Sequence, residues 1–352
     1  MSTEPEILFD SVDGIGFIRL NRPKALNALS HDMCRRLDER LGAWATDPSV
    51  SAVVIEGTGE KAFSAGGDIR ALYDSAKAGS PLCREFFADE YRMNARLHHF
   101  PKPYIALIDG IVMGGGVGVS VHGSHRVAGD RTLFAMPETG IGMLPDVGGT
   151  YFLPRLPGKL GLYLGLTGAR LRAADSLYAG VATHYVPSDR HADLKQALRK
   201  ATITSHRDVD EILARFTADP GPAPLERVRG LIDAAFSHGT VEEILAALEA
   251  QGDDFSVETR DTILSKSPTS LKLVNRQLRE GARLDFDECM KLEYRVVWRI
   301  MDGHDFFEGV RAVILDKDNA PKWNPARLED VSDAEIARYF ESLGRNELQL
   351  EL

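Results

Sequence analysis

The sequence predicts an α/β core followed by a mainly helical C-terminal region. In the first half of this 352-residue chain, short apolar runs alternate with helical patterns, as in strands joined by helices. After about residue 190, apolar residues recur at helical spacing instead. We therefore predict an α/β core with the active site over 1–190, and a mainly helical region that completes the fold over 191–352.

The core opens with strand patterns on either side of one helix pattern. Apolar runs at 6–10 and 14–20 predict a pair of strands, and the almost wholly apolar run at 51–57 predicts a buried strand. Between them, Ser30 can cap a helix whose apolar residues lie three or four positions apart, so they form one stripe that packs against the sheet. These apolar residues are Met33, Leu37, Leu41 and Trp44.

Two glycine clusters follow strand patterns, AFSAGGDI at 62–69 and GIVMGGGVGVS at 110–120. Further strand patterns occur at 103–110 and 126–136. Because glycine has no Cβ, main-chain N–H groups in each cluster can closely approach an anion or a polarised oxygen. Neither cluster is GxGxxG in an early strand–turn–helix context, and no GxxxxGK[ST] motif occurs, so dinucleotide and P-loop sites are not expected.

The segment MPETGIGMLPDVGG, residues 136–149, carries two acids among four glycines and two prolines. This composition is too irregular for a helix or a strand. The acids are Glu138 and Asp146. With the N–H donors of the glycine clusters, two carboxylates can stabilise an oxyanion while a proton or a water molecule moves.

The helical region contains amphipathic patterns at 207–216 and 240–251. The second pattern opens with Thr240 and Glu243 at the spacing of a capping box. Between the two patterns, DPGPAP at 219–224 predicts a turn-rich link between helices rather than a domain boundary.

Charge and cysteine content limit the partners that we expect. A net charge of −10 argues against nucleic acid and against anionic membrane surfaces, which leaves small molecules. Three cysteines without a CxxC pair support neither a disulfide framework nor a zinc site, and no histidine has a metal-ligand spacing, so no metal is expected. Because no secretory signal pattern and no membrane-spanning apolar run occur, we expect a cytoplasmic protein.

In their order and spacing, the glycine clusters and the acidic segment resemble the crotonase (enoyl-CoA hydratase/isomerase) superfamily. Further segments resemble its 3-hydroxyisobutyryl-CoA hydrolase branch, so the resemblance covers nearly the whole chain. It implies a crotonase-like spiral of ββα units with a helical C-terminal region. The branch segments are FFADEYRMN at 86–94, SPTSLKLVNRQL at 267–278 and GHDFFEGVRAVILDKDNAPKWNP at 303–325.

The resemblance implies catalytic roles for two backbone N–H groups and for two acidic side chains. The N–H groups of Gly67 and Gly115 would bind the thioester oxygen as an oxyanion hole. Glu138 would act on the thioester carbonyl as general base or nucleophile, with Asp146 assisting water or the substrate hydroxyl. Attack by water and attack by the Glu138 carboxylate, through a mixed anhydride, both remain open.

The resemblance also implies binding residues. Glu90 matches a position that approaches the substrate, although an acid on a helix can equally lie on an exposed face. CoA is expected at Lys24, Ala25, Leu26 and Ala65, with Lys24 meeting a phosphate. Because CoA belongs to the substrate, no separate cofactor is expected.

The activity that this resemblance implies is hydrolysis of 3-hydroxyisobutyryl-CoA in valine catabolism. An enoyl-CoA isomerase or hydratase is the alternative among enzymes. Hydratases of the superfamily carry a glutamate where this chain has Gly118, which counts against hydration, and Asp146 counts against isomerisation. A CoA-binding protein without turnover is the alternative from another class. Superfamily members often form homo-oligomers, and the sequence leaves that assembly undecided.

Overall fold

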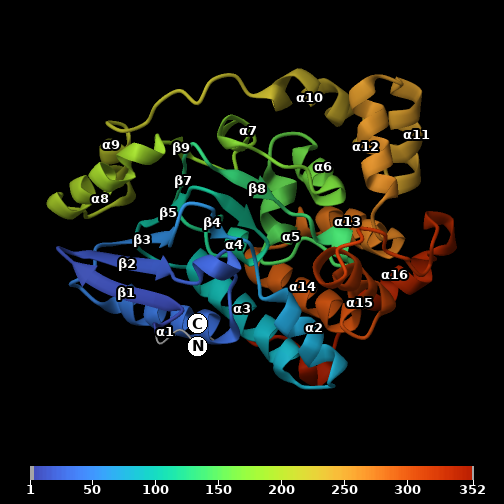
Figure 1. Ribbon diagram of the computed structural model, residues 1–352, viewed down its shortest axis with the longest axis horizontal. Coiled ribbons are helices and arrows are strands. Elements are labelled where there is room, and N and C mark those ends of the chain that lie inside the picture. Colours follow the sequence, from blue (N-terminus) through green and yellow to red (C-terminus); the bar gives the residue numbers. More distant parts are fainter. Residues whose placement is uncertain (1–3, 351–352) are drawn as a thin grey trace.

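The computed structural model describes residues 4–350, and strands and helices alternate through the first half of the chain (Figure 1). Its strands are β1 (Ile7–Val12), β2 (Ile15–Leu20), β3 (Ala52–Gly57), β4 (Ala62–Ser64), β5 (Tyr104–Ile108), β6 (Ile111–Met113), β7 (His125–Ala128), β8 (Leu133–Ala135) and β9 (His184–Tyr185). Six form a sheet in the order β1-β2-β3-β5-β7-β9, and three form a second sheet in the order β4-β6-β8. β1 and β2 pair antiparallel, and the other strand pairs are parallel.

From β3 onward, the chain alternates between the two sheets. β3, β5 and β7 join the larger sheet. The next strand along the chain after each of them (β4, β6 and β8 in turn) joins the smaller sheet. Each turn of the chain therefore adds one strand to each sheet, and the sheets grow together as a spiral. The predicted α/β spiral is confirmed.

Helices connect the strands and then form the rest of the chain. They are α1 (His31–Thr46), α2 (Ile69–Lys77), α3 (Leu82–His98), α4 (Gly115–Gly118), α5 (Gly149–Phe152), α6 (Leu160–Thr167), α7 (Ala173–Tyr178), α8 (His191–Lys200), α9 (His206–Leu213), α10 (Pro224–Ala235), α11 (Val241–Gln251), α12 (Asp254–Leu264), α13 (Pro268–Gly281), α14 (Phe286–Ile300), α15 (His304–Val310) and α16 (Asp333–Tyr339). In the described chain no strand follows β9.

The boundary at residue 190 stays a prediction, since α13 and α14 pack against α5 of the core. Of the helices between residues 4 and 350, none has both the length and the apolar character needed to cross a membrane.

Several local predictions are confirmed. The Ser30 hydroxyl accepts a hydrogen bond from the Met33 N–H at the start of α1, and the predicted apolar stripe of that helix is buried. The capping box of Thr240 and Glu243 opens α11. The link at 219–224 lies between α9 and α10, with Pro224 as the first residue of α10, and Figure 1 shows the chain between these helices running in the open along the top of the view.

The smaller sheet brings the candidate site together. Its three parallel strands each lead into one of the segments singled out in the sequence. β4 and β6 lie at the start of the first and second glycine clusters, and their glycines follow; residues 136–149, here called the acid loop, follow β8. Because the carboxyl ends of parallel strands lie at one edge of a sheet, the three segments meet there. Helices α13 and α14 pack beside this edge, against α5 at the end of the acid loop.

The contact between α13 and α5 leaves no room for a side chain at Gly281, where an added Cβ would lie 2.2 Å from the Thr150 carbonyl oxygen. We expect Gly281→Ala to lower the free energy of unfolding by about 1–3 kcal/mol, because the backbone must move apart. The control is Gly230→Ala, in the exposed face of α10, where an added Cβ would meet nothing within 4 Å. That change should raise the free energy of unfolding by about 0.5–1 kcal/mol in the same urea titration. Equal effects of the two substitutions would contradict this packing.

Candidate active site

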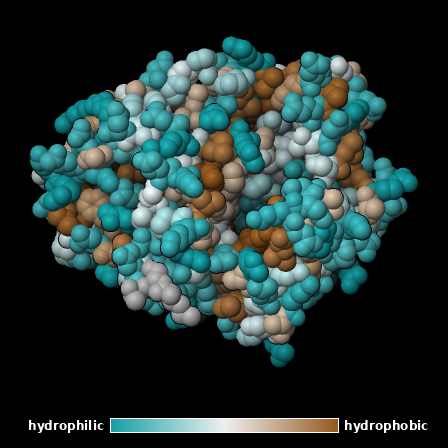
Figure 2. Space-filling model, viewed as in Figure 1, coloured by the Kyte–Doolittle hydropathy of each residue, from teal (hydrophilic) through white to brown (hydrophobic). Residues whose placement is uncertain are grey.

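A cavity of about 490 Å³ lies where the three segments meet. Of the nine site residues predicted from the sequence, six line it. These six are Ala65, Gly67, Glu90, Gly115, Glu138 and Asp146. Apolar side chains of α2 and α3, among them Leu72, Phe86 and Phe87, line it as well. On the face of the molecule in Figure 2, hydrophobic residues gather around a hollow near the centre, while hydrophilic residues cover most of the rest.

The two glycine clusters lie side by side in this cavity. A Cβ added to Gly115 would lie 3.2 Å from the Gly67 nitrogen and 2.6 Å from Glu90 Oε1, so a side chain here would displace Glu90 from the two glycines. Gly66 has a φ of +115°, which glycine adopts without strain. Among the described residues, the N–H groups of Gly67 and Gly115 donate to no acceptor. Two neighbouring free N–H groups are the arrangement that stabilises an oxyanion.

The two acids of the acid loop are both buried beside these glycines. Glu138 begins a 3₁₀ helix, η2 (Glu138–Ile141), and has 6% of its surface exposed, while Asp146 has 5%. Asp146 Oδ2 accepts a hydrogen bond of 2.7 Å from the Tyr91 hydroxyl. Glu138 Oε2 is buried and has no hydrogen-bond partner among the described residues. An unpaired buried oxygen at a cavity wall is available to a bound water or substrate.

Glu90 does not lie on an exposed helix face. It is on α3, it has 2% of its surface exposed, and it lines the cavity. Its Oε1 has no partner among residues 4–350 and faces the backbone of Gly115. The surface alternative for Glu90 is therefore wrong, and its contact with a substrate stays a prediction.

The buried carboxyl groups raise one another's pKa. Burial raises the pKa of Glu138 and of Glu90 well above the usual range, and the charge of Asp146 raises both further. Burial raises the pKa of Asp146 to about 6, with the Tyr91 hydrogen bond acting in the opposite direction. At neutral pH, Asp146 is therefore the acid that carries the negative charge most readily.

The sequence did not single out Glu293, a fully buried acid on α14. Its two carboxylate oxygens accept the N–H groups of Gly148, at 2.9 Å, and Thr150, at 2.8 Å. Burial, together with the charge of Asp146, raises the pKa of Glu293 to about 8. The only signal in the sequence is an acid among the apolar residues of a helix.

Gln277 on α13 also hydrogen-bonds to this part of the chain, and the sequence analysis did not identify it either. Its Nε2 donates to the Pro145 carbonyl and to the Thr150 hydroxyl, both at 2.7 Å. Asp146 thus lies between two residues that side chains of the C-terminal helices hold in place, Pro145 and Gly148.

The backbone after Asp146 adopts an unusual conformation. Val147 has a φ of 50° and Gly148 a φ of 89°, and the left-handed region is unfavourable for a β-branched residue such as valine. His122 Nε2 hydrogen-bonds the Val147 carbonyl at 2.7 Å, and because a carbonyl only accepts, Nε2 is the protonated nitrogen. Burial lowers the pKa of His122 to about 3, so the ring is neutral. His122 is thus a partner of the loop backbone.

Gly118 lies on α4, where the resemblance places the first glutamate of hydratases. A Cβ there would be 2.7 Å from Val147 Cβ and 2.8 Å from Asn94 Nδ2. This part of the site therefore has no room for a glutamate side chain.

Of the four residues predicted to bind CoA, Ala65 lines the cavity and the other three do not. The Ala65 N–H donates to the Leu26 carbonyl at 3.0 Å, so the segment around Leu26 runs beside the first glycine cluster. Lys24 and Ala25 are exposed and, like Leu26, do not line the cavity. Their contacts with CoA stay predictions. Asp68 caps α2 through the Ala71 N–H, at 3.2 Å.

The chain is similar to known proteins over nearly its whole length. The family model described as enoyl-CoA hydratase/isomerase matches residues 15–340. The 3-hydroxyisobutyryl-CoA hydrolase of Danio rerio is 49% identical over 350 residues, which cover 98% of this chain and 92% of that protein. The protein of the same name from Homo sapiens is 45% identical over 349 residues, covering 98% of this chain and 90% of that protein.

The cytoplasmic location expected from the sequence is contradicted by these relatives, which are named as mitochondrial proteins. That expectation rested on the lack of a secretory pattern and of a membrane span. Neither feature reports on mitochondrial import, which uses a different kind of segment.

Two solved structures share the fold over nearly their whole length. A carnitinyl-CoA dehydratase from Mycobacterium thermoresistibile has a TM-score of 0.92 at 44% identity, covering 99% of both chains. An enoyl-CoA hydratase from Rhodobacter sphaeroides 2.4.1 has a TM-score of 0.89 at 38% identity, covering 98% of this chain and 100% of that one. The chain therefore belongs to the enoyl-CoA hydratase/isomerase family, the crotonase superfamily, and its resemblance to the 3-hydroxyisobutyryl-CoA hydrolase branch is confirmed.

Proposed function

We propose that this protein is an acyl-CoA thioester hydrolase that converts 3-hydroxyisobutyryl-CoA to 3-hydroxyisobutyrate and CoA. One observation carries the proposal: two free N–H groups, at Gly67 and Gly115, share a buried cavity with Glu138 and Asp146. The names of the relatives support the choice of acyl group, and they also support a place in valine catabolism. Assembly into a homo-oligomer stays a prediction.

Hydrolysis adds a water oxygen to the thioester carbon and breaks its bond to sulfur. Negative charge develops on the carbonyl oxygen, where the N–H groups of Gly67 and Gly115 stabilise it. Glu138 takes the proton of the attacking water, and CoA leaves as a thiolate that is then protonated. In the other route the Glu138 carboxylate attacks the carbon, expels CoA, and forms a mixed anhydride that water hydrolyses.

Asp146 serves either route through its charge. Because its pKa is about 6, it is mostly ionised at neutral pH, while Glu138, whose pKa is raised well above the usual range, has a greater tendency to keep a proton. The two acids can therefore share one proton, which moves as the substrate binds. In the ionised form, Asp146 can also accept the hydroxyl of a 3-hydroxyacyl group.

The alternative is hydration or isomerisation of an enoyl-CoA, in line with the names of the two solved relatives. Hydration in this superfamily needs a second glutamate at the position of Gly118. Val147 and Asn94 occupy the space that its side chain would need. This packing favours the hydrolase.

The first test follows thiol release from 3-hydroxyisobutyryl-CoA, with crotonyl-CoA as a parallel substrate whose hydration is followed by absorbance. We expect thiol release without hydration, because Gly118 provides no carboxylate for the second proton transfer. Hydration of crotonyl-CoA without thiol release would refute the proposal.

The Glu138→Gln variant should keep the fold and the affinity for CoA but lose about 100-fold or more in kcat, because the amide is neither a base nor a nucleophile. Steady-state kinetics, together with calorimetry of CoA binding, measure this split. Glu85→Gln is the matched control, since Glu85 is an exposed acid on α3 that does not line the cavity. A Glu138→Gln enzyme with kcat close to that of Glu85→Gln would remove Glu138 from the mechanism.

The pH profile of kcat/KM should have its acid limb near pH 6 or above. Activity needs an ionised carboxyl group, so it is lost as the pH falls through the raised pKa of Asp146, about 6, and of Glu138. Asp146→Asn removes the charge that raises the pKa of Glu138, so the limb of the residual activity should move to lower pH. A limb near the ordinary glutamate pKa of about 4.3 in the unaltered enzyme would contradict this assignment.

A further inference from the structure

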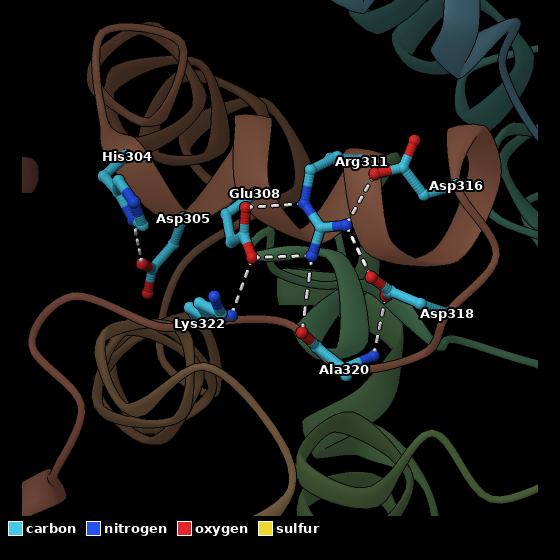
Figure 3. A network of polar contacts seen from close by, with 8 residues as sticks. All are labelled: His304, Asp305, Glu308, Arg311, Asp316, Asp318, Ala320 and Lys322. Carbon is cyan, nitrogen blue, oxygen red and sulfur yellow. Dashed lines mark hydrogen bonds and ion pairs between the residues drawn. The ribbon is translucent and has the colours of Figure 1, made fainter.

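Asp305, on α15, is a buried acid that has no part in the hydrolysis described above. It has 8% of its surface exposed, and it does not line the cavity. Its Oδ2 accepts the Ser267 hydroxyl at 2.6 Å, and its Oδ1 accepts the Asn324 N–H at 2.8 Å. His304 Nδ1 lies 3.1 Å from the same Oδ1, as Figure 3 shows. One carboxyl group therefore joins α15 to the start of α13 and to the chain that follows α15.

Ser267 extends this connection to the turn that carries Glu138. It is the N-cap of α13, and its main-chain N–H donates to the Thr139 carbonyl at 3.2 Å. The Ser267 hydroxyl accepts from the Ser270 N–H while it donates to Asp305, so its orientation is fixed. Two hydrogen bonds thus lead from Asp305 to the residue beside Glu138.

The backbone of α15 also packs directly against this turn, η2. A Cβ on Gly142, where the turn ends, would lie 2.3 Å from the Asp305 carbonyl oxygen. A Cβ on Gly309, one helical turn further along α15, would lie 2.5 Å from Ile141 Cα. Backbones that approach this closely leave no free space between them, so the position of η2 depends on that of α15.

Another side of α15 holds residues 311–322, here called the strap, several of which line the cavity (Figure 3). Glu308 on α15 accepts the Lys322 N–H at 2.8 Å, two residues before Asn324. Arg311 binds both oxygens of Glu308 at 2.9 Å and two further acids within the strap. α15 is therefore fixed between the strap on one side and η2 on another.

The Glu138 side chain needs support from its backbone. Its Oε2 accepts no hydrogen bond from the described residues, so no such bond holds this oxygen at the cavity wall. The place of the carboxyl group depends instead on the turn that carries it. A displacement of about 1 Å at a catalytic group can lower the rate about 100-fold.

We propose that Asp305 is a positioning residue for Glu138. The inference rests on the proposed function, in which Glu138 acts on the thioester. Asp305 holds Ser267 and the chain after α15, and Ser267 and the α15 backbone hold η2. The Glu138 carboxyl group is thereby kept beside the N–H groups of Gly67 and Gly115.

The first test measures kcat per CoA-binding site in Asp305→Ala, with the sites counted by calorimetric titration with CoA. This kcat should fall about tenfold or more while KM changes less than about twofold, because only the placement of Glu138 is altered. Asp305→Asn keeps one acceptor oxygen and should lose less. A loss of folded protein lowers the number of sites and leaves kcat per site unchanged. An unchanged kcat per site would therefore overturn the proposal.

Asp253→Ala is the matched control. Asp253 likewise accepts one serine hydroxyl and one backbone N–H, both from Ser256, at 2.7 and 3.1 Å. It lies at the start of α12 and does not line the cavity. We expect this variant to lose stability but to keep kcat per site. Equal losses of kcat per site in Asp253→Ala and Asp305→Ala would contradict a specific role for Asp305.

The route through Ser267 is tested with Ser267→Ala, which keeps the carboxyl group of Asp305 and can be measured even where Asp305→Ala folds poorly. If the two residues act through their hydrogen bond, the loss of kcat in the double variant Asp305→Asn, Ser267→Ala should be smaller than the product of the two single losses. Losses that simply multiply would show that the two residues act independently, against the proposal.

Hydrogen exchange separates this inference from the proposed function, because it needs no turnover. The N–H groups of Gly142 and Met143 donate to the Glu138 carbonyl, so their exchange reports on η2. Exchange in residues 136–143 should be about tenfold faster in Asp305→Ala and unchanged in Asp253→Ala. Faster exchange in a protein that hydrolyses no thioester would refute the hydrolase alone. Hydrolysis with unchanged exchange and kcat in Asp305→Ala would refute the positioning role alone.

Discussion

The hydrogen bonds of Glu293 to the N–H groups of Gly148 and Thr150 are the contact on which the site depends. They join α14 to the acid loop across 145 positions of sequence. The loop needs such a contact because Val147 is held at a φ of 50°, which valine does not favour by itself. A buried carboxyl group that accepts hydrogen bonds from two N–H groups supplies free energy against that strain. Asp146 is in place because its neighbours on both sides are fixed.

The same contact adds a fourth carboxyl group to a buried region that already holds three. Burial penalises every charge there, and each ionised group raises the pKa of the others, so they ionise one at a time rather than together. The hydroxyl of Tyr91 favours the charged form of Asp146, so the first charge goes there. A site that holds one negative charge among several acids keeps a neutral acid and a base side by side, which is what proton transfer to and from a thioester requires.

The sequence was sufficient for the features that depend on neighbouring residues. The stripe of α1, the capping box of α11 and the glycine clusters after strands follow from local spacing, and each lies in the structure as predicted. The roles of Glu138 and Asp146 came from resemblance, and the structure adds their burial. Glu293 and Gln277 could not be found this way. Their roles depend on partners more than 100 positions away, which a local pattern does not report.

The choice between hydrolysis and hydration can be understood as a packing constraint on one scaffold. In the superfamily the helix after the second glycine cluster can carry an acid, but here Gly118 on α4 lies against Val147 and Asn94. Val147 holds that position with a left-handed backbone, at the point where the chain runs from Asp146 into α5. One loop conformation thus closes the place of the missing acid and supplies another, Asp146. Restoring a glutamate at Gly118 alone would therefore collide with Val147, because the two acid positions cannot be exchanged without refolding the loop.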